Sequence, residues 1–265
     1  IKLLEMGIDN IVVNPADVPT GQKENLQKTD AVDSNKIARS LRGNALTGIH
    51  VPRIETMEAR TLLRTRDALV KDLSRMKQRV KSLLNLYGIS YPEEFTKVGT
   101  HWSKRFMTWL KEDIQFTTPQ GRDGLHFLLS SVESQRTLLL EATRKLRELS
   151  RSETYARDYE LLRSVPGIGM ITALAFLTEL EDVRRFNNSD QLASYIGIVP
   201  TSHSSGEKER KGEMTFRGRS KLREKLIECS WTSARLDPAL SLSFNKYVQR
   251  MEPNKAITRI ARKVL

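Results

Sequence analysis

The chain has 265 residues, with 44 lysines and arginines against 32 aspartates and glutamates, and a formal net charge of +12. This length allows one large or two modest domains, and the interleaved acids argue against a disordered basic tail. The cationic bias favours nucleic acid or another polyanion as the partner, with a soluble protein that is basic for no such reason as the alternative. A single cysteine, Cys229, excludes an internal disulfide framework and indicates a reducing cytoplasm. Its apolar helical surroundings predict a position in the core. The longest apolar run, residues 170–177, is too short to span a membrane and no signal peptide precedes it, so we expect a soluble cytoplasmic protein.

Both ends of the chain resemble interrupted helices. Ile1 lies inside an amphipathic pattern, and residues 256–265 stop in another without a cap, so we expect a fragment of a longer protein. Residues 1–6 predict a helix end closed by Gly7. The β-branched run 8–13 that follows predicts a buried parallel strand of an α/β layer.

Two aspartates stand at the start of the next predicted helix. Thr29 or Asp30 is its N-cap, and the i, i+3 spacing places Asp30 and Asp33 on one face. Acids at a helix start can simply complement the helix dipole. Alternatively they are oxygen ligands for Mg²⁺, a metal that is often shared with substrate phosphates. The residues alone leave both interpretations open.

A long, charged helix is predicted over residues 52–87, and a second follows at 125–149. Their apolar residues alternate steps of four and three, which is typical of a heptad seam. The predicted seams are Leu69, Leu73, Met76, Val80, Leu83 and Tyr87 in the first helix, and Leu125, Leu128, Val132, Gln135, Leu139, Ala142, Leu146 and Leu149 in the second. The segment between, with Trp102 and Trp109, predicts a small aromatic cap. The pattern favours an antiparallel hairpin or a dimerising coiled coil, with core helices of a bundle as the alternative, and a homo-oligomer is expected.

A helix, the turn Pro166-Gly167-Ile168-Gly169 and a second helix have the pattern of a helix-hairpin-helix. Its glycines allow consecutive backbone N–H groups to face a DNA phosphate without reading sequence. Gly167, Ile168 and Gly169 are therefore candidate DNA-binding residues. An inert helical turn is the alternative.

The stretch from Val199 to Gly206 predicts an exposed serine loop. Ser204 and Ser205 stand before a glycine, where a hydroxyl is presented with little steric cover, and a serine beside a phosphate is a candidate nucleophile. Ser-Ser-Gly is also a common linker composition. The candidate phosphate-binding residues that follow are Lys208, Arg210, Lys211, Thr215, Arg217, Arg219, Lys221 and Arg223. This run, which leads into an amphipathic helix up to Arg235, is expected to track a nucleic-acid backbone.

Several spaced elements occur together in one order. They are Val165-Pro166-Gly167-Ile168-Gly169, Leu192 to Pro200, Ser204-Ser205-Gly206, Gly218 and Leu222-Arg223. In this order the sequence resembles the C-terminal half of DEDD-type transposases of IS116/IS110/IS902-type insertion sequences, whose relatives include the Piv DNA invertases. The resemblance covers roughly residues 8–265 and includes Asp30-x-x-Asp33.

The resemblance implies a mainly α fold with a partial α/β layer. Residues 1–52 would be the remainder of a RuvC-like DEDD domain, related to RNase H. Residues 53–155 would be a coiled-coil helical insertion. Residues 156–265 would be the transposase C-terminal domain, with a helix-hairpin-helix and a catalytic serine.

The function implied by the resemblance is DNA transposition or recombination guided by a bridge RNA, through a covalent phosphoserine link. Asp30 and Asp33 match the last two of four acids that bind Mg²⁺, and Ser205 best matches the nucleophile, with Ser204 as the alternative. The first aspartate and the glutamate of that set would lie upstream of Ile1, so we expect this chain alone to bind nucleic acid but not to recombine it. Phe216 stands where a polar residue is expected.

Two other functions fit the residues. One is a non-catalytic helix-hairpin-helix protein that bridges DNA through its basic surface, with salt-dependent binding and no need for Mg²⁺. The other is a metal-dependent junction nuclease in which the serine is incidental.

Overall fold

The computed structural model describes residues 2–21, 29–205 and 208–265 and divides into two compact units, Ile1–Ile54 and Glu55–Leu265. The described residues are mainly helical, with one two-stranded sheet, which confirms the mainly α prediction. None of the helices in these ranges combines the length and apolar character needed to cross a membrane.

The described residues of the first unit form two helices and a short 3-10 turn. α1 (Lys2–Glu5) ends at Gly7, whose φ of 69° is the left-handed conformation of a helix terminator. The turn η1 (Pro15–Asp17) follows, and then α2 (Asp30–Arg42). Thr29 is the N-cap of α2, because its hydroxyl accepts a hydrogen bond from the Val32 N–H (3.3 Å). Both predicted helix boundaries are confirmed.

The predicted strand over residues 8–13 is wrong. Within the described part of this unit, Val13 forms one isolated antiparallel bridge with Gly48. A strand is stabilised by a ladder of backbone hydrogen bonds to its neighbour, and a single bridge does not supply one. Ile8 and Ile11 accordingly remain 46% exposed instead of buried.

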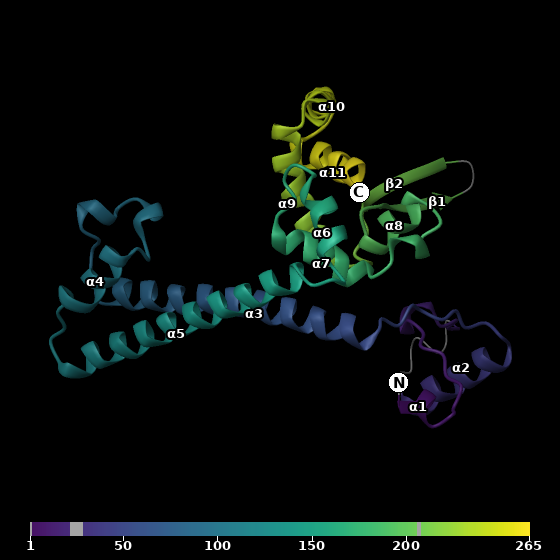
Figure 1. Ribbon diagram of the computed structural model, residues 1–265, viewed down its shortest axis with the longest axis horizontal. Coiled ribbons are helices and arrows are strands. Elements are labelled where there is room, and N and C mark those ends of the chain that lie inside the picture. Colours follow the sequence, from purple (N-terminus) through teal and green to yellow (C-terminus); the bar gives the residue numbers. More distant parts are fainter. Residues whose placement is uncertain (1, 22–28, 206–207) are drawn as a thin grey trace. The chain divides into compact units, whose positions relative to one another are not determined.

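Two long helices begin the second unit. α3 spans Ile54–Leu86, α5 spans Pro119–Ser150, and they run in opposite directions (Figure 1). Their shared buried cluster includes four predicted seam residues, Leu73, Val80, Leu125 and Val132. This arrangement matches the antiparallel hairpin among the predicted alternatives, while association of two chains through it stays a prediction.

The segment between the two long helices forms an aromatic cap, as predicted. It contains η2 (Glu93–Phe95), η3 (Val98–Thr100) and α4 (Lys104–Glu112). Phe106 is fully buried, with ring centroids 5.2 Å from Phe95 and 5.4 Å from Trp109. The heptad prediction was wrong at its end: Tyr87 lies beyond α3 and is 54% exposed, whereas Leu84 is buried.

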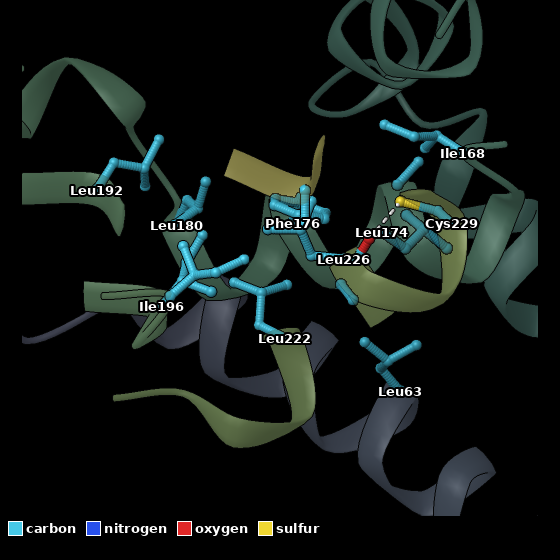
Figure 2. Close-up of a cluster of buried hydrophobic side chains, with 14 of the residues drawn as sticks. Leu63, Ile168, Leu174, Phe176, Leu180, Leu192, Ile196, Leu222, Leu226 and Cys229 are labelled. Carbon is cyan, nitrogen blue, oxygen red and sulfur yellow. Dashed lines mark hydrogen bonds between the residues drawn. The ribbon is translucent and has the colours of Figure 1, made fainter. Parts of the chain in front are cut away.

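Short helices and one β-hairpin form the rest of the second unit. They are α6 (Ala156–Arg163), α7 (Met170–Leu180), η4 (Val183–Arg185), α8 (Ser189–Ile196), β1 (Pro200–Ser205), β2 (Lys208–Met214), α9 (Ser220–Leu236), α10 (Pro238–Val248) and α11 (Pro253–Val264). Figure 2 shows their core, in which Leu174 of α7 and Leu226 of α9 meet Leu63 of α3. Cys229 lies in this core, as predicted, and its thiol donates to the Leu226 carbonyl (3.1 Å).

The C-terminal end of α7 is tied to α3 by a buried arginine. Arg60 donates from Nε to the Thr178 carbonyl (2.6 Å) and from Nη2 to the Glu179 carbonyl (3.2 Å). The last carbonyls of a helix have no partner within it, so the guanidinium of Arg60 satisfies two of them. The Glu179 carboxylate in turn pairs with Arg64 (2.6 Å). These bonds fix α7, and the turn before it, against the long hairpin.

Candidate nucleic-acid interface and serine hairpin

The predicted serine loop is wrong, because Ser204 and Ser205 belong to strand β1 of an antiparallel hairpin. In its register Ser205 pairs with Lys208 and Ser204 with Glu209. Gly206 and Glu207, which connect the strands, lie outside the described residues, as do the side chains of residues 202–211. The prediction missed the strands since their residues are almost all polar and show no alternation of apolar and polar positions.

Two glycines close the base of this hairpin. Gly197 (φ 86°) precedes β1 and Gly218 (φ 98°) follows β2, and both have left-handed backbones. A Cβ on Gly218 would lie 2.7 Å from the Cα of Gly197, and a Cβ on Gly197 would lie 2.2 Å from the Arg217 carbonyl oxygen. The two chain segments therefore cross at a distance that only glycine permits.

Arg223 of α9 clamps the same base. Its Nη1 donates to the carbonyls of Gly197 (2.9 Å) and Thr215 (2.8 Å) and lies 3.4 Å from that of Arg217. These carbonyls stand on both sides of the hairpin, just before β1 and just after β2. The guanidinium predicted to contact phosphate thus holds the two ends of the hairpin together.

The neighbouring basic residues differ in the contacts that their side chains make within the protein. The Nε of Arg219 donates to the Tyr195 hydroxyl (3.2 Å), and its guanidinium lies 5.4 Å from the centre of that ring. The Thr215 hydroxyl accepts from the Arg217 N–H (3.1 Å). Arg217, Arg219 and Lys221 all have exposed side chains. Phe216 is 92% exposed, which leaves the position without polar contact in this turn.

The predicted helix-hairpin-helix residues lie in the turn between α6 and α7. Gly167 has φ 94° and packs against α9, where a Cβ would come within 2.5 Å of the Cys229 carbonyl oxygen. Ser233 of α9 secures the turn by donating to the Pro166 carbonyl (2.5 Å). Gly169 is the N-cap of α7, with open space where a Cβ would lie.

Ile168 takes a different part in this turn. Its side chain is 6% exposed and belongs to the core, and its N–H donates to the Val165 carbonyl (3.1 Å). Any contact to phosphate would come from Gly169 and the first turn of α7, whose N–H groups have no partner within the helix. This is the one end of the turn that is both open and rich in donors.

Asp30 and Asp33 occupy the first turn of α2, as predicted. Asp30 is exposed, and Asp33 is half-buried with Oδ1 3.7 Å from the Lys36 ammonium. Their carboxylate oxygens are suitable donors for Mg²⁺. Nowhere in the described residues do three or more histidine, cysteine or acidic side chains gather in a way that could hold a metal ion. The role of Asp30 and Asp33 as metal ligands therefore stays a prediction.

The predicted acids and the predicted serines belong to different compact units of the structure. Asp30 and Asp33 belong to the first unit, and Ser204 and Ser205 to the second. Sequence reasoning missed Arg60, which holds the end of α7. It also missed that Arg223 binds the carbonyls at the base of the hairpin. The bonds of both span many residues, so no local pattern could indicate them.

Models of known families match the two regions that carry these residues. A model described as the transposase IS116/IS110/IS902 family matches residues 159–245, which include the α6–α7 turn, the hairpin and all of α9. A second model, described as a transposase, matches residues 2–89, which include Asp30 and Asp33.

Individual relatives agree with these matches. Protein y4qE of Sinorhizobium fredii, which carries the name of a transposase, is 30% identical over 227 residues, or 86% of this chain and 53% of that protein. The transposase of element IS1111A from Coxiella burnetii is 26% identical over 262 residues, or 97% of this chain and 70% of the relative. The pilin gene-inverting protein of Moraxella bovis is 33% identical over 117 residues, or 40% and 34% of the two chains.

The chain therefore spans about half of one of these transposase relatives and 70% of another. Both family models carry the name transposase, and they match the N-terminal and C-terminal parts of the chain in the expected places. The resemblance noted in the sequence is confirmed: the chain belongs to the IS116/IS110/IS902 family of transposases.

Proposed function

We propose that this chain is part of an insertion-sequence transposase that cuts and rejoins DNA, with Ser205 as the nucleophile and Ser204 as the alternative. The observation that carries the proposal is the clamped hairpin. Arg223 and the two facing glycines hold both ends of the strands that bear the serines. A nucleophile needs a fixed position relative to its phosphate, and a hairpin with a rigid base provides it.

The proposed reaction has two steps. In the first, the serine oxygen attacks phosphorus in line, the new P–Oγ bond forms, and the P–O bond to the leaving strand breaks. The serine loses its proton and the leaving sugar oxygen gains one. In the second, the sugar hydroxyl of the joining strand attacks the phosphoserine, and the serine hydroxyl is restored. The number of phosphodiester-type bonds is unchanged, so no external energy source is required.

Asp30 and Asp33 would hold Mg²⁺ in this scheme. When bound, the metal neutralises charge on the phosphate that is attacked. The two carboxylates would orient that phosphate from the first turn of α2, together with ligands outside this chain's described residues. Because these acids and the serines lie far apart in the sequence, we propose a composite site that assembles within one subunit or between two.

DNA and a bridge RNA are the proposed partners, and a homo-oligomer is the proposed assembly. The support is the family membership, the formal charge of +12 and the long helical hairpin of α3 and α5. Two groups of donors would contact phosphates without reading bases. One is the start of α7 after Gly169, and the other comprises Arg217, Arg219 and Lys221.

The test is a search for a covalent adduct. The longest natural protein that contains this chain is incubated with RNA transcribed from its element, end-labelled donor DNA and Mg²⁺, and is then run on a denaturing gel. A labelled band at protein mass that Ser205→Ala abolishes supports the proposal. A band that survives Ser205→Ala and disappears with Ser204→Ala moves the nucleophile by one residue, and survival in both variants refutes the serine scheme.

A non-catalytic DNA-bridging protein is the second candidate. It is favoured by the formal net charge of +12, which suits a protein that binds DNA through a basic surface. It predicts strong binding that weakens with salt and does not change when Mg²⁺ is removed, without adduct or cleavage. Nicked DNA without an adduct would instead indicate a metal-dependent nuclease.

A further inference from the structure

Three cations gather where the aromatic cap meets the long hairpin. Lys77 and Lys81 stand one turn apart on α3, and Arg136 lies on α5. Trp102 of the cap joins them. The Lys77 ammonium lies 5.4 Å from the centre of the Trp102 ring, and Arg136 donates from Nη1 to the Trp102 carbonyl (3.2 Å). The fold thus assembles this cation cluster from two helices, with Trp102 of the cap beside Lys77 and Arg136.

The cation cluster has no acidic partner in the described part of the chain. Neighbouring cations do have one: Arg75 pairs with Asp72 (3.0 Å), Arg105 with Glu94 (3.0 Å) and Lys145 with Glu148 (2.9 Å). Like charges at i and i+4 of a helix repel each other, as Lys77 and Lys81 do. Within the described residues, no carboxylate offsets the repulsion between these like charges.

Burial makes the missing counter-charge more costly. The side chains of Lys77 and Lys81 are half-buried. Burial, and then the charges of Arg136 and Lys81, lower the pKa of the Lys77 ammonium. A bound anion would oppose this lowering of the Lys77 pKa, because it supplies the opposite charge in a partly desolvated place where Coulomb attraction is stronger than in water.

We propose that Lys77, Lys81 and Arg136 form a binding site for the phosphate backbone of nucleic acid, fixed against Trp102. The site lies outside the two regions assigned to phosphate contacts above, and gives the helical hairpin a ligand of its own. It uses three cations held in place by the fold, so it recognises backbone charge and no base sequence. Duplex DNA and single-stranded RNA share this chemistry.

The test compares two triple variants of the full chain that lose the same charge. The cluster variant is Lys77→Gln, Lys81→Gln, Arg136→Gln, and the control is Arg75→Gln, Arg105→Gln, Lys145→Gln, which removes three paired cations. Dissociation constants for a duplex DNA and a single-stranded RNA of equal length are measured over a range of salt concentrations. Each phosphate contact contributes about 0.9 to the slope of log K against log salt for duplex DNA and about 0.7 for single strands.

We expect the cluster variant to reduce the slope by about 2 to 3 with the nucleic acid that occupies the site, and the control by less than about 1. The nucleic acid whose salt slope falls more in the cluster variant is the one that occupies the site. Equal reductions in the two variants, or none in either, would overturn the proposal. Failure of the unsubstituted chain to bind either nucleic acid would count against the proposed function as well, so the two failures are distinguishable.

Thermal unfolding of the proteins without nucleic acid tests whether the three cations stabilise the fold. The cluster variant loses the Arg136 bond to Trp102 and the Lys77 contact with its ring, but it also loses the repulsion between like charges, so its stability should stay close to that of the unsubstituted chain. A clear loss of stability in the cluster variant alone would mean that the three cations serve the fold, and would contradict the proposed site.

Discussion

At the scale of single residues, burial controls the chemistry of Cys229. Burial in the core raises the pKa of its thiol from 9.0 to about 11. Because the thiolate is the reactive form, labelling by a disulfide reagent at pH 8 should be at least about 100-fold slower in the native protein than in urea. Native labelling at the unfolded rate would show that the thiol is accessible and ionised.

The same shift makes stability depend on pH. Above pH 9 the unfolded thiol ionises, while the folded thiol stays protonated up to about 11, so the folded state binds more protons. The free energy of unfolding should therefore fall as the pH rises through this window. Urea unfolding at several pH values measures it, and Cys229→Ala should remove this part of the dependence.

Arg60 is the residue whose loss should cost most stability outside the apolar core. Arg60→Leu removes two bonds to the end of α7 and leaves the mostly buried Glu179 carboxylate with less compensation. We expect the free energy of unfolding to fall by about 2–4 kcal/mol. Arg64 also pairs with Glu179, but its side chain is 51% exposed, so Arg64→Leu should cost less than about 1 kcal/mol. Circular dichroism in urea compares them, and equal losses would contradict the buried role of Arg60.

At the scale of elements, the β-hairpin depends on the glycines at its base. Gly197→Ala adds a Cβ 2.2 Å from the Arg217 carbonyl oxygen in a left-handed conformation, so it should cost at least about 2 kcal/mol of stability. Gly124 in α5 has nothing within 4 Å of a new Cβ, and Gly124→Ala should stabilise by up to about 1 kcal/mol. Chemical denaturation of both variants tests this, and a harmless Gly197→Ala would refute the close crossing.

Arg223 and Lys221 lie on the same helix, α9, but their substitution should have different effects. If Arg223 positions the hairpin, Arg223→Met should reduce adduct formation by the longest natural protein at least 10-fold more than it weakens DNA binding. Lys221 is exposed, so Lys221→Met should instead lower the salt slope of binding by about 1 with little further change in adduct yield. Equal effects of the two substitutions on binding and adduct would mean that Arg223 is an ordinary phosphate contact.

Helix boundaries could be predicted because their signals are local. Thr29 and Asn188 cap α2 and α8 through bonds to amides three residues away, and Gly197 ends α8 in a left-handed conformation. The β-hairpin could not be predicted, since its polar strands carry no periodicity and its base is closed by a bond from Arg223 to a carbonyl 26 residues away. The strand over residues 8–13 failed for the converse reason: its β-branched composition was right, but a partner ladder is absent from the described residues.

At the scale of the whole molecule, the sequence identified the residue types of the candidate site better than their arrangement. The order of motifs indicated the family, which the comparisons confirm. It could not indicate that Arg60 reaches a carbonyl 118 residues away, or that Ile168 turns into the core while Gly169 stays open. Such long-range contacts depend on how the elements pack, and the spacing of residues along the chain does not predict this packing.

α3 belongs to two buried clusters of the second unit, because Leu63 lies in the C-terminal core and Leu84 in the core of the aromatic cap. Its 33 residues form one uninterrupted helix, about 50 Å long at 1.5 Å per residue. A tilt of about 5° at the end held by Arg60 would therefore move the opposite end by about 4 Å. A small rotation of α3 where it packs in the C-terminal core would therefore produce a larger displacement of the aromatic cap at the other end of the helix.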